Sequence, residues 1–148
     1  MESGNLLIDA QTAFSRQRRK RRRARVIGRL RGRSGHLGRL TALEEALGAA
    51  PPSNRRAGGL EAIPLDSIVG TAEPAKARVF DNCFRVPESS RRRWESLWMA
   101  SRKGSSVPPI SVFRLAGEHF VDDGHHRVSV AHALGMVAID AEVTELAA

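Results

Sequence analysis

The stretch Val121-Asp-Asp-Gly-His-His-Arg-Val-Ser-Val-Ala-His-Ala-Leu-Gly135 changes from a strand pattern to a helix pattern at a single glycine. Phe120 and Val121 end an apolar run, and small or branched residues at helical spacing follow Gly124. A helix that begins directly after a strand and a glycine leaves its first N–H groups open, and such groups bind anions. The stretch therefore predicts both a strand–helix junction and a candidate phosphate site.

The residues around this junction predict a small α+β domain with a mixed sheet. The face formed by Trp94, Leu97 and Trp98 indicates a helix packed in the core, and residues 71–87 are predicted to be irregular. In chain order we expect a strand over 60–65, a one-turn helix over 66–70, a helix from Ser89 or Ser90 to Gly104, strands over 110–115 and 118–123, a helix over 125–134 and a strand over 137–143.

The basic charge of the chain is concentrated at its N-terminal end. The 148 residues carry a net charge of +8, of which residues 1–40 contribute 12 Arg and Lys against Glu2 and Asp9, a net +10. Residues 41–148 hold the other 12 basic residues and 14 acidic residues, a net −2. We therefore expect a basic arm over 1–40, disordered or helical only when bound, before a near-neutral domain over 60–148.

Residues 41–59 are expected to connect the arm to the domain. Thr41-Ala-Leu-Glu44 has the spacing of a capping box, which predicts a short helix over 41–48. The following residues, 49–59, have the composition of a linker.

The arm is a candidate nucleic-acid-binding segment because its cations are dense, and its charged run from Ser15 to Arg33 has no aromatic side chain for stacking on bases. DNA or RNA would then be bound through phosphates, without sequence preference and with strong salt dependence. A solvated tail or a tether to anionic lipid would satisfy the same charges. The candidate residues are Arg16, Arg18, Arg19, Lys20, Arg21, Arg22, Arg23, Arg25, Arg29, Arg31 and Arg33.

At the junction, the candidate phosphate-binding residues are Gly124, His125, His126 and Arg127. The candidate catalytic residues are Asp122, Asp123 and His126, because a carboxylate could hold Mg²⁺ through water beside a phosphate and a histidine could transfer a proton near neutral pH. The simpler alternative is that Asp123 caps the helix and the histidines are only solvated.

A direct metal-ligand cluster is not expected in this chain. The side chains of His125 and His126 diverge by about 100° on a helix, and His132 lies two turns beyond His125. The single cysteine, Cys83, excludes an intrachain disulfide and a multi-cysteine zinc site. No apolar run reaches membrane-spanning length, so we expect a soluble, cytoplasmic protein.

Two segments together resemble a known superfamily. Ala62-Ile-Pro-Leu-Asp-Ser-Ile68 and Gly124-His-His-Arg-Val-Ser-Val-Ala131 resemble the ParB N-terminal domain and sulfiredoxin superfamily over residues 60–146, and the Asp-Gly-His-His-Arg version is similar to small bacterial ParB-like proteins. The resemblance implies that Gly124, His126 and Arg127 bind the phosphates of a nucleotide and that Ala131 is the small helix residue. The nucleotide would be a triphosphate, and Mg²⁺ could accompany it through one of the two aspartates. Sulfiredoxins carry a reactive cysteine after the glycine, where this chain has His125, so sulfinic acid reduction is not expected.

Three functional hypotheses follow. The first is a regulatory nucleotide-binding domain, related to chromosome partitioning, whose arm binds nucleic acid. A sliding DNA clamp is not expected, because a second helix motif and a helix-turn-helix reader do not follow the phosphate turn. The second is a phosphotransferase, phosphohydrolase or nuclease that uses the same turn, and the third is an adaptor domain with a vestigial site. The base, the reaction and the oligomeric state stay open.

Overall fold

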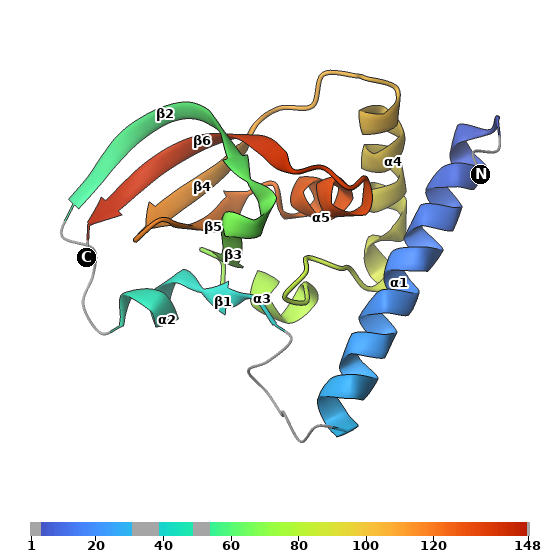
Figure 1. Ribbon diagram of the computed structural model, residues 1–148, viewed down its shortest axis with the longest axis horizontal. Helices are drawn as coiled ribbons and strands as arrows, with labels where there is room; N and C mark the ends of the chain where they lie inside the picture. The colour runs from blue at the N-terminus through green and yellow to red at the C-terminus, as the bar shows by residue number, and fades with distance from the viewer. Residues whose placement is uncertain (1–3, 31–38, 49–53, 148) are drawn as a thin grey trace.

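The computed structural model describes residues 4–30, 39–48 and 54–147. These residues form one mixed sheet with helices gathered beside it (Figure 1), which confirms the predicted α+β class. In chain order the elements are α1 (Leu6–Leu30), β1 (Thr41–Ala42), α2 (Leu43–Leu47), β2 (Asn54–Pro64), the 3-10 turn η1 (Leu65–Ser67), β3 (Ile68–Thr71), α3 (Lys76–Val79), the 3-10 turn η2 (Glu88–Ser90), α4 (Arg91–Arg102), β4 (Ile110–Leu115), β5 (Glu118–Asp123), α5 (His125–Ala133) and β6 (Ala138–Ala147).

The sheet has six strands in the order β1-β3-β5-β4-β6-β2. Strands β1, β3 and β5 are parallel neighbours, β4 is antiparallel to β5 and parallel to β6, and β2 is antiparallel to β6. The predicted β4–β5 hairpin is confirmed. Both residues of its turn, Ala116 (52°) and Gly117 (82°), have positive φ. Positive φ at both positions is typical of the two-residue turns whose twist matches that of the flanking strands. The helix α5 also lies where the sequence predicts it, and β6 covers the predicted final strand but continues to Ala147.

The N-terminal half of the sheet differs from the sequence expectations. Strand β2 already begins at Asn54, inside the expected linker, because its first half pairs with the end of β6, with Asn54 opposite Ala147. The expected one-turn helix over 66–70 is instead the turn η1 followed by β3, which pairs with both β1 and β5. Both differences come from strand partners that are distant in the sequence.

The predicted capping box is not formed either. Thr41 and Ala42 pair with β3 as a short parallel strand, and α2 begins only at Leu43, without a side-chain cap. In the segment predicted to be irregular, residues 71–87, the structure has the one-turn helix α3. Residues 49–53 of the expected linker lie outside the described residues.

The main core lies between the sheet and the helices α4 and α5. Trp94 has no exposed surface and Trp98 is 7% exposed, so the predicted core role of the α4 face is confirmed. The Trp94 indole Nε1 donates a hydrogen bond to Ser129 Oγ of α5 over 2.9 Å. A smaller cluster of Leu115, Phe120 and Leu146, with Leu43 and Leu47 of α2 packed on it, lies apart from this core.

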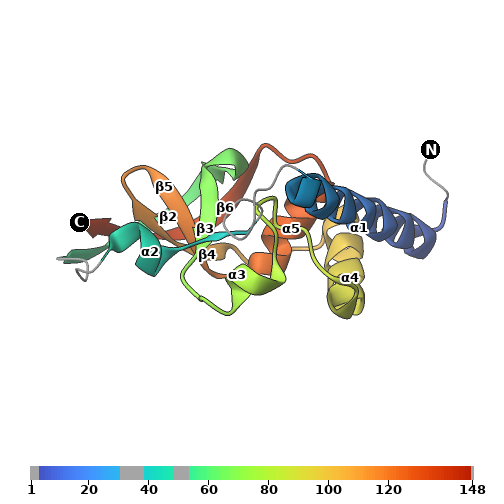
Figure 2. The same ribbon diagram turned by 90° about the horizontal axis from the view of Figure 1, so that it is seen from below.

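Helix α1 packs along α4 through its N-terminal half (Figures 1 and 2). Ala10 and Phe14 are fully buried, and the Phe14 ring meets the Trp94 ring edge-on at 5.5 Å. The amide of Gln17 exchanges two hydrogen bonds with the backbone of Val86, at 3.1 Å and 2.9 Å. These three residues recur at helical spacing, so one face of α1 is held by the domain.

The expected arm thus contains a docked helix. Ala10 and Phe14 lie within residues 1–40 but before the charged run from Ser15 to Arg33, so most of the apolar face that docks α1 is outside the segment that carries the positive charge. The division of the chain at residues 40 and 59 stays a prediction. Arg31 and Arg33 lie outside the described residues.

Replacing Phe14 tests this docking. We expect Phe14→Ala to lower the free energy of unfolding by about 3 kcal/mol, because a fully buried ring is lost against Trp94. Urea unfolding followed by tryptophan fluorescence measures the change. Leu30→Ala, on the same helix at an 82% exposed position, is the control and should change stability by less than about 0.5 kcal/mol. Superimposable curves for Phe14→Ala and the unmodified protein would show that α1 is not docked.

Candidate functional site

A hollow of about 530 Å³ opens at the start of α5. Its wall comes from the loop after β3, from α3, from one side of α4, and from the end of β5 with the first turn of α5. All of the residues predicted for the phosphate turn and for catalysis line it, together with two cations from other elements. The lining residues are Glu73, Lys76, Arg93, Ser96, Leu97, Asp122, Asp123, Gly124, His125, His126 and Arg127.

Gly124 is required by the backbone at the entrance to α5. Its φ of +109° is rarely adopted by other residues, and an added Cβ would lie 2.5 Å from Ile110 Cγ2. The position is also the N-cap of α5, and no side chain caps it. The simpler alternative, a helix capped by Asp123, is therefore not formed. The first-turn N–H groups that precede the Val128 N–H to Gly124 carbonyl bond lack partners within the helix.

A β-bulge sets the direction of the two aspartates. Ser111 of β4 pairs with Asp123, whereas the next residue, Val112, pairs with Val121, so Asp122 is the extra residue in β5. Without this bulge, regular strand geometry would place the two adjacent side chains on opposite faces of the sheet. Both carboxylates instead line the hollow.

His125 is held by protein contacts at the inner wall of the hollow. The residue is 4% exposed, its Nε2 lies 2.6 Å from Thr71 Oγ1, and its ring stacks on Phe80 at 5.5 Å. Burial, with smaller contributions from Lys76 and His126, lowers the pKa of His125 to about 4. His125 is therefore neutral near pH 7 and joins α5 to β3.

His126 is only half-buried, and its ring meets the edge of Phe80 at 5.1 Å. Burial lowers the pKa of His126 to about 4, and the positive charges of Arg93 and Lys76 add to the effect. At neutral pH this side chain is an uncharged imidazole beside two cations. Such a group can donate one hydrogen bond but is a poor general acid.

Arg127 is already engaged by the protein. One terminal nitrogen of its guanidinium donates to the carbonyl oxygens of Pro108 and Pro109, both at 2.8 Å, and the other donates to Asp123 Oδ2 at 3.1 Å. Its side chain is 16% exposed. Arg127 thus fastens the loop between α4 and β4 to the start of α5, and fewer of its N–H groups remain for a ligand than the sequence suggests.

Lys76 and Arg93 are lining residues that the sequence analysis missed. Lys76 comes from the one-turn helix α3, in a segment that was predicted to be irregular. Arg93 comes from the flank of α4. The only local signal was the helical spacing of Arg93, Ser96 and Leu97, which lie together beside the core face of Trp94. Lys76 had no sequence signal.

The possible metal ligands and the one cysteine have positions that can be compared with this hollow. Among residues 4–30, 39–48 and 54–147, no group of three or more His, Cys, Asp or Glu residues is arranged to hold a metal ion directly. Cys83 lines a different hollow, beside Arg16, Lys20 and His132. Over the same ranges, no helix has the length and apolar character needed to cross a membrane.

A serine–histidine contact elsewhere is structural. Ser67 Oγ lies 2.8 Å from His119 Nδ1, but the hydroxyl donates to the Pro64 carbonyl at 2.6 Å. Arg114 Nε donates to His119 Nε2 at 2.9 Å, so Nδ1 carries the ring proton. A histidine in this tautomer donates to the serine and cannot accept its proton, which excludes a Ser67 nucleophile activated in this way.

Comparisons with known proteins give one structural similarity. No family model and no curated protein matches the chain. The crystal structure of sulfiredoxin from Arabidopsis thaliana is similar, with a TM-score of 0.42 and 20% sequence identity over 57% of this chain and 82% of that chain. The superfamily indicated by the sequence stays a prediction at this level of similarity.

The lowered histidine pKa values predict a pH-dependent stability. An unfolded histidine titrates near 6.5 and folded His125 near 4, so the unfolded chain binds more protons between these values. The free energy of unfolding should therefore be highest above pH 6.5 and fall toward pH 4.5, with about 2 kcal/mol of the decrease due to His125. Urea unfolding at several pH values measures this.

His125→Gln is the matched variant. It should be less stable than the unmodified protein at pH 7, because the Thr71 and Phe80 contacts are altered, but should lose less stability between pH 6.5 and 4.5. An equal pH dependence in both proteins would show that His125 titrates normally.

Proposed function

We propose that the hollow at the start of α5 binds the phosphate groups of a nucleotide. The observation that carries the proposal is the convergence of the uncapped first turn of α5 with Lys76 and Arg93 on one hollow. Helix-end N–H groups and the positive end of the helix dipole favour an anion. Lys76 and Arg93 add full positive charges from two other elements, so three independent segments contribute to one anion site.

The size of the hollow favours a nucleotide over a single phosphate ion. A volume of about 530 Å³ lies within the range of small-molecule sites. The apolar side chain of Leu97 also lines it, beside Ser96. The resemblance of residues 62–68 and 124–131 to ParB-like domains supports the same ligand class.

Three carboxylates fit a magnesium complex of the nucleotide. Glu73 and Asp122 are exposed at the hollow, and Asp123 is exposed although it pairs with Arg127. Bare phosphates would be repelled by these groups, whereas hydrated Mg²⁺ bound to phosphate oxygens would accept them as water-mediated partners. Mg²⁺ should therefore strengthen nucleotide binding.

The site supports binding better than acid–base catalysis. With its pKa near 4, His126 is unprotonated at neutral pH and is a weak base there. Asp123 is occupied by Arg127. The roles of Asp122, Asp123 and His126 as catalytic residues stay predictions, and turnover would favour the phosphotransferase or phosphohydrolase alternative.

Thermal unfolding of the full chain with each nucleoside triphosphate and Mg²⁺ tests the proposal. A bound nucleotide at 100 times its Kd should add about 3 kcal/mol to the free energy of unfolding. Arg93→Gln should weaken the affinity about tenfold, because it removes a charged donor to phosphate. Arg92→Gln, the exposed neighbour that does not line the hollow, is the control and should bind normally.

Two results would contradict the proposal. If no nucleotide stabilises the protein, the hollow does not bind nucleotides, and the hypothesis of an adaptor domain with a vestigial site is favoured. If Arg92→Gln and Arg93→Gln weaken binding equally, the nucleotide binds outside the hollow. Inorganic triphosphate in the same assay shows whether a base is read, and assays for released phosphate in these samples detect turnover.

A further inference from the structure

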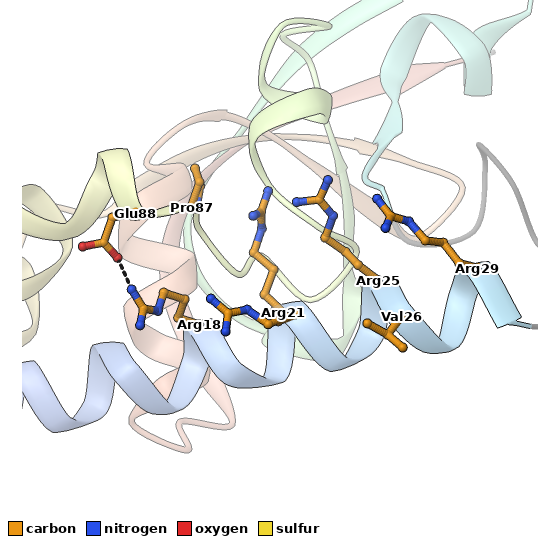
Figure 3. Close-up of a pocket in the computed structure, with 8 residues that line it drawn as sticks. Arg18, Arg21, Arg25, Val26, Arg29, Pro87 and Glu88 are labelled. Atoms are coloured by element: carbon orange, nitrogen blue, oxygen red, sulfur yellow. Dashed lines mark hydrogen bonds and ion pairs between the residues drawn. The ribbon is translucent and has the colours of Figure 1, made fainter.

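A second hollow, of about 360 Å³, runs along α1 beside residues 87 and 88. We call it the arginine groove; it shares no residue with the hollow at α5. Figure 3 shows four of its arginines leaving α1 on the same side. The lining residues are Arg18, Arg21, Arg22, Arg25, Val26, Arg29, Pro87 and Glu88.

The arginine groove carries a large excess of positive charge. Glu88 is the one acidic residue among the described residues that line it, and this carboxylate is shared between Arg18 of α1 and Arg91 of α4, each at 2.7 Å. Within the part of the chain that the structure describes, no carboxylate forms an ion pair with Arg25 or Arg29. Arginines four apart on one helix also repel one another, so an external anion would stabilise α1.

Arg21, at the inner side of the groove, is a cation with too few hydrogen-bond acceptors. One of its terminal nitrogens donates to the Val79 carbonyl at 3.4 Å, while its Nε is buried and has no hydrogen-bond partner among the described atoms. Burial, and then the charge of Arg25, lower the pKa of Arg21, against the opposite effect of Asp81. A donor in this situation lacks the oxygen acceptor that a guanidinium usually binds.

We propose that the arginine groove binds the phosphodiester backbone of a nucleic acid, along the axis of α1. Arg18 and Arg29 are eleven residues apart, so their row extends about 16 Å along the helix, long enough to face several successive phosphates of one strand. None of the described residues that line the groove is aromatic. Binding is therefore to phosphate and independent of base sequence.

The groove divides the cations of α1 between different faces of the helix, which the composition of the basic segment does not reveal. Arg16 and Lys20 line the separate hollow beside Cys83, and Arg19 and Arg23 are exposed and line neither hollow. The docking of Phe14 on Trp94 fixes which face of α1 meets residues 87 and 88. The cations of one helix face are thus held in place before a ligand arrives, which lowers the entropy cost of binding.

A nucleic acid fits this arrangement better than an anionic membrane does. A helix that lies in a lipid surface inserts its apolar face, but the apolar face of α1 at Ala10 and Phe14 is buried against the domain. The inner cation, Arg21, is partly buried and lies beside the carbonyl of Val79. A protruding phosphate can enter such a groove, whereas a flat layer of headgroups meets only its rim.

Two double variants of the full chain separate the groove from diffuse charge. Arg25→Gln with Arg29→Gln removes two groove cations, and Arg19→Gln with Arg23→Gln removes two exposed cations from the same helix outside it. Fluorescence anisotropy with a random-sequence duplex and a random single strand, each of about 20 nucleotides per strand, gives Kd between about 50 and 200 mM salt.

The groove variant should bind at least about tenfold more weakly at the lower salt, with the slope of log K against log salt reduced by about 2. The control variant should stay within about threefold of the unmodified protein, and both should keep its thermal midpoint. The two probes show whether a duplex or a single strand is preferred, and either preference supports the proposal.

An equal loss of nucleic-acid affinity in both double variants would overturn the proposal, because binding would then depend on net charge alone. Absence of binding to both probes would also overturn it. Tighter binding to vesicles rich in phosphatidylserine than to either nucleic acid, with the same dependence on Arg25 and Arg29, would assign the groove to a membrane instead. The outcome is independent of nucleotide binding at α5, because the two sites have no residue in common.

Discussion

The burial of Trp94 holds the two candidate sites in place. Its ring receives the edge of Phe14 from α1, and its indole N–H donates to Ser129 of α5. The next residue toward the N-terminus, Arg93, reaches the hollow at α5. One fully buried side chain therefore sets the position of α4 between α1 and α5, and with it the cations on both sides of α4.

The parts of the fold that local sequence determines were predicted well. The β4–β5 hairpin follows from alternation around Ala116-Gly117, and α4 follows from the spacing of Trp94, Leu97 and Trp98. Strands β1 and β3 were missed because they are short and pair in parallel with partners far along the chain. Such strands have no turn signal, and their stability comes from the finished sheet rather than from their own residues.

Only the part of the site that comes from one continuous stretch of sequence was predicted. Gly124 and the residues that follow it line the hollow, as a glycine-entered helix suggests, but the protein already engages Arg127 and His125. Lys76 and Arg93 enter from other elements, and their approach depends on tertiary packing. The bulge at Asp122 was equally hidden, because it exists only as a mismatch of register with β4.

The pairing of β2 with β6 has a consequence for how the chain reaches this structure. The two strands join residues 54–64 to residues 138–147, so almost the whole domain lies between them. Contacts of such long sequence separation form late and slow the search for the native state. During synthesis, β2 has to wait without its partner until β6 has left the ribosome, and its exposed edge is open to wrong partners in that interval.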